Sequence, residues 1–150
     1  MTNDIDPELL DSAQLLQQDT VELRRMIHAE PELGLDLPKT QAKIVDALTG
    51  LGLDITLGES TTSVVADLDT GRPGPKVLLR GDMDALPLQE DNEFDYRSTI
   101  DGVMHACGHD AHVRCSSAQP DCFRKTKAPS MVRLDSCSSL AKKVTTALAT

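Results

Sequence analysis

The spacing of apolar residues in this 150-residue chain changes once, and that change constrains the fold more than any other feature. Up to residue 51, apolar residues recur at helical spacing, which predicts one amphipathic helix over residues 7–30, broken once, and a second over residues 39–51. Pro31 ends the first run, Pro38 stands at the start of the second, and Gly50 supplies a stop. The first third of the chain is therefore predicted to be helical.

Beyond residue 51 the pattern becomes that of short strands. Segments rich in valine and leucine lie at residues 55–57, 63–68 and 76–80, and glycines and prolines punctuate this part of the chain. Two helices followed by three strands, one with a near-continuous Val-Leu-Leu run, predict an α/β layer fold in which strand ends carry the chemistry. Residues 80–87 (RGDMDALP) lie at such an end.

Composition and charge argue against several classes of protein. The net charge is −9 with no cluster of lysine and arginine, so we expect no binding to nucleic acid. The chain has no apolar stretch long enough to span a bilayer, and its start resembles no signal peptide, so we expect a cytoplasmic protein without a membrane partner. In that reducing compartment the four cysteines are expected to be metal ligands or free thiols rather than disulfides.

Residues 104–112 (MHACGHDAH) place three of the four histidines, one cysteine and one aspartate within nine residues. Imidazole, thiolate and carboxylate are the side chains that bind borderline divalent ions such as zinc. The small residues between them leave room for the ligands to converge. This segment is therefore a candidate metal site.

Four motifs occur in order along the chain: RRMIHAEPELG at 24–34, the helix containing Thr40, LLRGDMDALPLQE at 78–90, and GVMHACGHDAH at 102–112. Together they resemble the amidohydrolase branch of the aminoacylase-type metallopeptidases, which includes hippurate hydrolases and N-acyl-amino-acid amidohydrolases. The resemblance implies a zinc-peptidase-like three-layer α/β fold, of which residues 1–113 form the N-terminal part of the catalytic domain. It also implies small N-acyl amino acid or peptide-like substrates and homo-oligomeric full-length relatives.

The same resemblance implies a centre of two divalent ions, zinc or manganese, with cobalt or nickel also suited to the ligands. Cys107 and His109 match the metal ligands of the branch. Asp84 matches an aspartate that orients a ligand by hydrogen bonding, whereas Asp82 stands where the wider family often has a ligand histidine. His28 is expected to organise the fold rather than take part in catalysis.

The composition changes after Val113. Residues 1–113 contain 8 basic and 22 acidic residues, whereas residues 114–150 contain 7 basic and 2 acidic residues, together with three of the four cysteines. Back-translation of this tail in a shifted frame permits the helix that the family places after its GHDAH motif. We therefore expect residues 114–150 to be a frame-shifted, disordered tail that forms no domain.

This tail lacks the Glu-Glu pair in which the family keeps its catalytic base, so the chain alone is expected to be inactive. Two other functions remain open. One is a small structural zinc module, in which the four ligands would be Cys107, His109, His112 and Cys115. The other is a non-catalytic interaction fragment that binds a partner through a short helix over residues 140–149.

Overall fold

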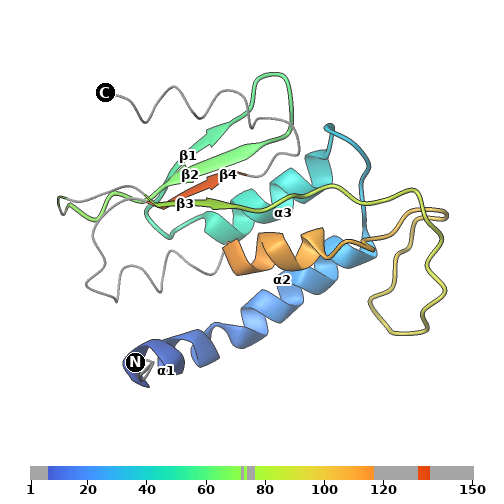
Figure 1. Cartoon of the computed structure of the whole chain (residues 1–150), viewed down its shortest axis with the longest axis horizontal. Helices are drawn as coiled ribbons and strands as arrows, with labels where there is room; N and C mark the ends of the chain where they lie inside the picture. Colours follow the sequence, from blue (N-terminus) through green and yellow to red (C-terminus); the bar gives the residue numbers. More distant parts are fainter. Residues whose placement is uncertain (1–6, 72, 74–76, 117–131, 136–150) are drawn as a thin grey trace, which may run out of the picture.

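The structure is a computed structural model of the whole chain, and it describes residues 7–71, 73, 77–116 and 132–135 (Figure 1). Helix α1 spans Pro7–Leu15, α2 spans Gln17–Ala29 and α3 spans Pro38–Leu48. The predicted helix over residues 7–30 is thus confirmed, with its single break at Leu16. Both later helices bury an apolar face, because their buried residues recur every three or four positions.

Helix α3 begins at Pro38, as the sequence predicts, and ends at Leu48, three residues before the predicted end at residue 51. Pro38 opens the helix, and Gly50, just beyond its end, adopts a φ of 81°. The carboxylate of Glu32 accepts hydrogen bonds from the backbone N–H groups of Lys39 (3.2 Å) and Thr40 (2.7 Å). Glu32 therefore caps the first turn of α3 and ties it to the end of α2.

The sheet contains four strands in the order β1-β2-β4-β3. The three predicted strands are confirmed as β1 (Asp54–Leu57), β2 (Val64–Asp67) and β3 (Val77–Arg80). Strand β4 (Val132–Asp135) pairs antiparallel with β2 and parallel with β3. The sheet is therefore mixed, and β3 forms one of its edges.

Strand β4 comes from the segment for which no domain was expected, and it lies inside the sheet rather than at an edge. Four residues of that segment thus form the strand that pairs with both β2 and β3 in the sheet. The predicted short helix over residues 140–149 lies outside the described residues, as do Cys122 and Cys137.

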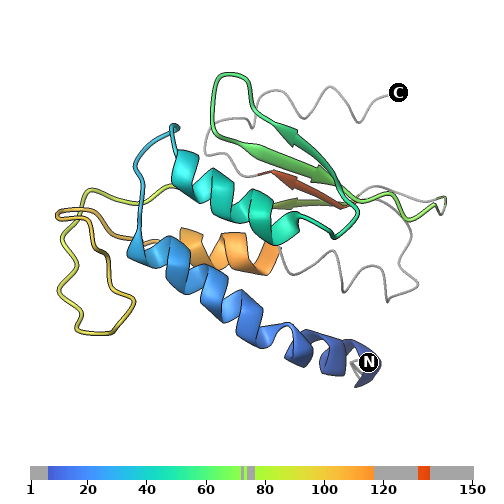
Figure 2. The same cartoon turned by 180° about the vertical axis from the view of Figure 1, so that it is seen from behind.

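The helices lie on one side of the sheet in the two opposite views of Figures 1 and 2. Helix α3 packs against β2 and α2, and a further helix covers residues 109–116. The buried core joins these elements through aliphatic residues, namely Leu23, Ile27, Leu37, Ile44, Leu48, Val64, Ala66, Leu68, Met83 and Val113. Within the described part of the chain, the fold is a mixed α/β arrangement of one sheet and one helical layer. The third layer expected from the resemblance is not among the described residues.

None of the helices in the described ranges is long and apolar enough to cross a membrane.

Candidate metal centre

The segment that follows β3, which carries Asp82 and Asp84, is held by backbone hydrogen bonds to two other parts of the chain. The backbone N–H of Ala85 donates to the carbonyl of Glu32 (2.8 Å), and Leu86 exchanges two hydrogen bonds with Met104 (2.9 and 3.0 Å). Met83 and Ala85 are buried in this extended segment. Because side chains alternate along an extended chain, Asp82 and Asp84 both lie on its other face.

The helix of residues 109–116 presents two histidines beside this segment. His109 and His112 are three positions apart, so they share one face of the helix, and their rings stack with centroids 5.6 Å apart. The helix approaches the end of β3 closely at Gly81. A Cβ atom built there would lie only 3.1 Å from Ser116 Oγ and 3.2 Å from the carbonyl oxygen of His112. A glycine at this position permits the contact.

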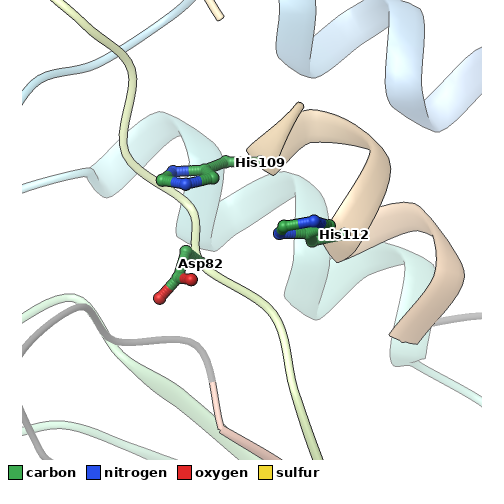
Figure 3. Close-up of side chains that lie close together, drawn as sticks. All are labelled: Asp82, His109 and His112. Carbon is green, nitrogen blue, oxygen red and sulfur yellow. The ribbon is translucent and has the colours of Figure 1, made fainter. Parts of the chain in front are cut away.

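Asp82, His109 and His112 meet at this contact. One possible ligand atom from each residue lies within 4.8 Å of those of the other two (Figure 3). Asp82 and His109 are half-buried, whereas His112 is exposed. One carboxylate and two imidazoles form a donor set typical of zinc and of other first-row divalent ions.

Asp84 fixes the orientation of His109. Nδ1 of His109 lies 2.9 Å from the backbone carbonyl oxygen of Asp84 and 3.0 Å from its Oδ1. Both oxygens are acceptors, so Nδ1 carries the proton and Nε2 keeps its lone pair for a metal ion. Asp84 thus makes the orienting contact that the sequence predicted for it, although this geometry does not test a catalytic role.

Cys107 lies in the exposed turn before the helix and is a free thiol. It does not belong to the group formed by Asp82, His109 and His112. Its assignment as a metal ligand therefore stays a prediction. Of the four ligands of the alternative zinc module, the structure brings only His109 and His112 into this group, while Cys115 is a second exposed free thiol.

The motifs did not indicate Asp82 as a ligand, and His112 was named only as a ligand of the alternative zinc module. The signal for His112 was its spacing of three residues from His109 at the start of a helix. The signal for Asp82 was its alternation with Asp84, which puts both carboxylates on one face of the segment after β3. Neither pattern reveals that this segment and the helix touch, because that contact is tertiary.

Arg80 supplies a positive charge beside the group. Its Nη2 lies 2.7 Å from Oδ1 of Asp82, and both side chains are accessible to solvent. An ion pair of this kind contributes little to stability. It does satisfy one oxygen of Asp82.

A second set of polar residues joins α2, the segment after β3 and the helix of residues 109–116; His28, Glu90 and Asp110 are buried, and Arg24 is partly exposed. Oδ2 of Asp110 accepts a hydrogen bond from Nε of Arg24 (2.9 Å) and lies 2.9 Å from Nδ1 of His28. Nε2 of His28 lies 3.1 Å from Oε1 of Glu90. The position of His28 in this buried set agrees with its expected role in organising the fold.

The environments of the two carboxylates keep them ionised. Burial alone would raise the pKa of Glu90, but hydrogen bonds from Asn92, Ser98 and His28 outweigh it and lower that pKa to about 2. Burial opposes ionisation of Asp110 too, yet His28 and Arg24 lower its pKa. Both groups therefore carry a negative charge in the folded protein.

His105 is buried nearby, and neither of its ring nitrogens has a hydrogen-bond partner among the described residues. Burial lowers its pKa to about 4, so the ring is neutral at neutral pH.

Comparison with known proteins identifies the family. Residues 78–129 match the peptidase family M20/M25/M40. An N-acyl-L-amino acid amidohydrolase from Geobacillus stearothermophilus is 44% identical over 99 residues, which are 65% of this chain and 26% of that protein. The hippurate hydrolase of Campylobacter jejuni is 42% identical over 107 residues, which are 71% of this chain and 27% of that protein. This chain belongs to the M20 peptidase family.

Within the M20 family, the chain resembles the amidohydrolase branch, as the sequence motifs indicated. YxeP of Bacillus subtilis, described as a dinuclear metal binding peptidase of the family, superimposes with a TM-score of 0.74 at 30% identity. That match covers 82% of this chain and 35% of YxeP. The chain spans about a quarter of the length of the curated M20 relatives that it matches. The family match also extends past Val113 to residue 129.

Proposed function

We propose that this chain supplies part of a divalent-metal centre that hydrolyses the amide bond of N-acyl amino acids or small peptide-like substrates. The observation that carries the proposal is the convergence of Asp82, His109 and His112. The similarity to the two amidohydrolases and to YxeP, a dinuclear metal binding peptidase, supports it. The whole enzyme is proposed to use two ions, zinc or manganese, with cobalt or nickel able to replace them.

Each residue of the centre has a proposed role. Asp82, His109 and His112 would hold one ion, and Asp84 would keep His109 in the tautomer that binds it. Cys107 stays a proposed ligand, because its exposed thiol lies two residues before His109 and a thiolate is a strong ligand for zinc.

Amide hydrolysis needs more than these ligands. A bound divalent ion polarises the substrate carbonyl and lowers the pKa of a bound water towards neutrality. A general base must then accept a proton from the attacking water. We find no Glu-Glu pair downstream of the motif in this chain, so we propose that the chain alone does not turn over substrate.

Titration with Co²⁺, followed by its visible absorption, tests the metal centre. We expect Asp82→Asn, His109→Gln and His112→Gln each to weaken Co²⁺ binding by at least about tenfold, because each variant removes one ligand. Asp46→Asn, at an exposed position on α3, is the matched control and should bind like the parent. Equal Co²⁺ affinity in the three ligand variants and the parent would refute the centre.

The absorption spectrum also tests Cys107. A thiolate ligand produces a charge-transfer band of Co²⁺ in the near ultraviolet, and we expect Cys107→Ser to abolish it. Cys115→Ser is the control and should retain the band. A parent spectrum without the band would remove Cys107 from the ligand set. Asp82, His109 and His112 would remain proposed ligands.

Hydrolysis of benzoylglycine in the presence of Zn²⁺ or Mn²⁺ tests the proposed inactivity. We expect the chain to release no more product than the double variant Cys107→Ala, His109→Ala. Turnover above that control would show that this chain contains its own catalytic base.

A further inference from the structure

His28 links three segments of the chain that are far apart in sequence. It lies on α2, and its two ring nitrogens face Asp110, on the helix of residues 109–116, and Glu90, in the segment after β3. The separations along the chain are 82 and 62 residues. All three side chains are buried.

The ring of His28 spans the gap between the two carboxylates. Its Nδ1 lies 2.9 Å from Oδ2 of Asp110, and its Nε2 lies 3.1 Å from Oε1 of Glu90. Each nitrogen of this buried ring thus contacts a carboxylate oxygen, and His28 joins the helix of residues 109–116 to the segment after β3.

Asp110 connects His28 to the candidate metal centre. It lies directly after His109 and two residues before His112 in the first turn of their helix. Among the described residues, its Oδ2 meets Arg24 and His28, both on α2, and its Oδ1 is buried without a hydrogen-bond partner. Two side chains of α2 therefore hold this carboxylate and the turn that carries it.

Aromatic packing keeps His28 in place. The rings of Phe94 and Tyr96 lie 5.7 Å from the His28 ring, centroid to centroid, and stack on each other at 4.2 Å. The guanidinium of Arg25 covers Tyr96 at 4.8 Å. Two of the three Phe and Tyr residues in the chain thus surround His28.

We propose that His28 is a positioning residue, which bridges Asp110 and Glu90 and thereby sets the orientation of the helix that presents His109 and His112. This inference rests on the proposed metal centre. His28 does not touch the ligands, and it acts only through Asp110.

The test uses the full chain and Co²⁺ as the probe. In His28→Gln, the amide cannot reach both carboxylates and the buried Glu90 loses the ring nitrogen that faces it, so we expect about tenfold weaker Co²⁺ binding and a changed visible spectrum. In the double variant His28→Gln, Glu90→Gln, one negative charge is also removed, and we expect most of the affinity and the parent spectrum to return.

Ile44→Val is the control for a loss of stability alone. Ile44 is a core residue of α3 and is not one of the residues that contact the Asp110 carboxylate. It should leave the spectrum unchanged. If His28→Gln does not fold, Glu90→Gln alone should still alter the spectrum, because it changes one of the two carboxylates that His28 bridges.

The outcomes separate the two proposals. A parent chain that gives no Co²⁺ spectrum would overturn the metal centre itself. A parent spectrum that is unchanged in His28→Gln, or in Glu90→Gln where the first variant does not fold, would overturn the positioning role and leave the centre intact. A changed spectrum restored by the double variant supports the role.

Discussion

At the scale of single residues, the most informative contact is the one between Asp84 and His109. A metal ion needs a ring nitrogen with a free lone pair, and two oxygens of Asp84 determine which nitrogen of His109 that is. The backbone oxygen alone could hold this tautomer. The carboxylate adds negative charge, which makes the ring a stronger ligand.

Replacing Asp84 tests this effect. We expect Asp84→Asn to weaken Zn²⁺ binding by about 10- to 100-fold, because the amide retains the shape of the side chain and loses its charge. Isothermal titration calorimetry measures the change, and Asp95→Asn, at an exposed position, is the matched control. Unchanged affinity in Asp84→Asn would mean that the backbone oxygen suffices.

The depressed pKa of Glu90 makes a second prediction at this scale. In the folded chain this pKa is lowered from 4.5 to about 2, so the unfolded chain takes up the proton first as the pH falls. The stabilisation is complete above pH 4.5 and is lost as the pH falls through about 2. The shift corresponds to on the order of 3 kcal/mol.

Urea denaturation across this pH range checks the prediction. The free energy of unfolding of Glu90→Gln should depend less on pH than that of the parent. Glu93→Gln, at an exposed position in the same segment, should follow the parent. Identical pH profiles for Glu90→Gln and the parent would contradict the shift.

Sequence alone identified part of the candidate site. His109 and Asp84 were selected from motifs, and the structure joins them by a hydrogen bond. Asp82 was not selected, and His112 was named only for the alternative zinc module, because their proximity depends on how closely β3 approaches the helix of residues 109–116. A local pattern contains no information about that distance.

At the scale of elements, the candidate centre depends on one close contact between two of them. The end of β3 delivers Asp82, the helix delivers His109 and His112, and Gly81 lies where the two backbones meet. Any side chain at Gly81 would push them apart.

Gly81→Ala tests this contact. The new Cβ would lie 3.1–3.3 Å from Ser116 Oγ and from the carbonyl group of His112, so these neighbours must give by a few tenths of an ångström. We expect a loss of about 1–3 kcal/mol in the free energy of unfolding and weaker Co²⁺ binding. In the double variant Gly81→Ala, Ser116→Ala, the contact with Ser116 Oγ is relieved, and part of the stability should return. Parent-like stability and binding in Gly81→Ala would show that the contact is not tight.

The elements themselves were largely predictable. Periodic apolar residues and the positions of proline and glycine predicted α1 to α3 and β1 to β3, which the structure confirms. The insertion of β4 between β2 and β3 was not predicted, because strand pairing between segments more than 50 residues apart leaves no local pattern. The helix of residues 109–116 was also not assigned for this chain from apolar spacing, since polar side chains dominate its first turn.

At the scale of the whole molecule, this chain matches about a quarter of the length of its M20 relatives. Amide hydrolysis is therefore proposed for the whole enzyme and not for this chain alone. The composition still changes sharply after Val113, although the family match continues to residue 129 and β4 lies beyond that point.

We propose that the reading frame shifts near the codon for Val113. The nucleotide sequence of the gene decides the matter. We expect a neighbouring frame to encode the continuation of the family, including a Glu-Glu-Gly triplet where this chain has residues 141–144. The idea is wrong if no other frame encodes that continuation.

The central claim is that Asp82, His109 and His112 bind one divalent ion. X-ray absorption at the zinc edge of the Zn²⁺-loaded chain tests it most directly, because it reports the ligand atoms around the metal. We predict nitrogen and oxygen ligands at about 2.0–2.2 Å with outer-shell scattering from two imidazoles, and a sulfur at about 2.3 Å if Cys107 also binds. Zinc that shows no imidazole scattering would contradict the claim.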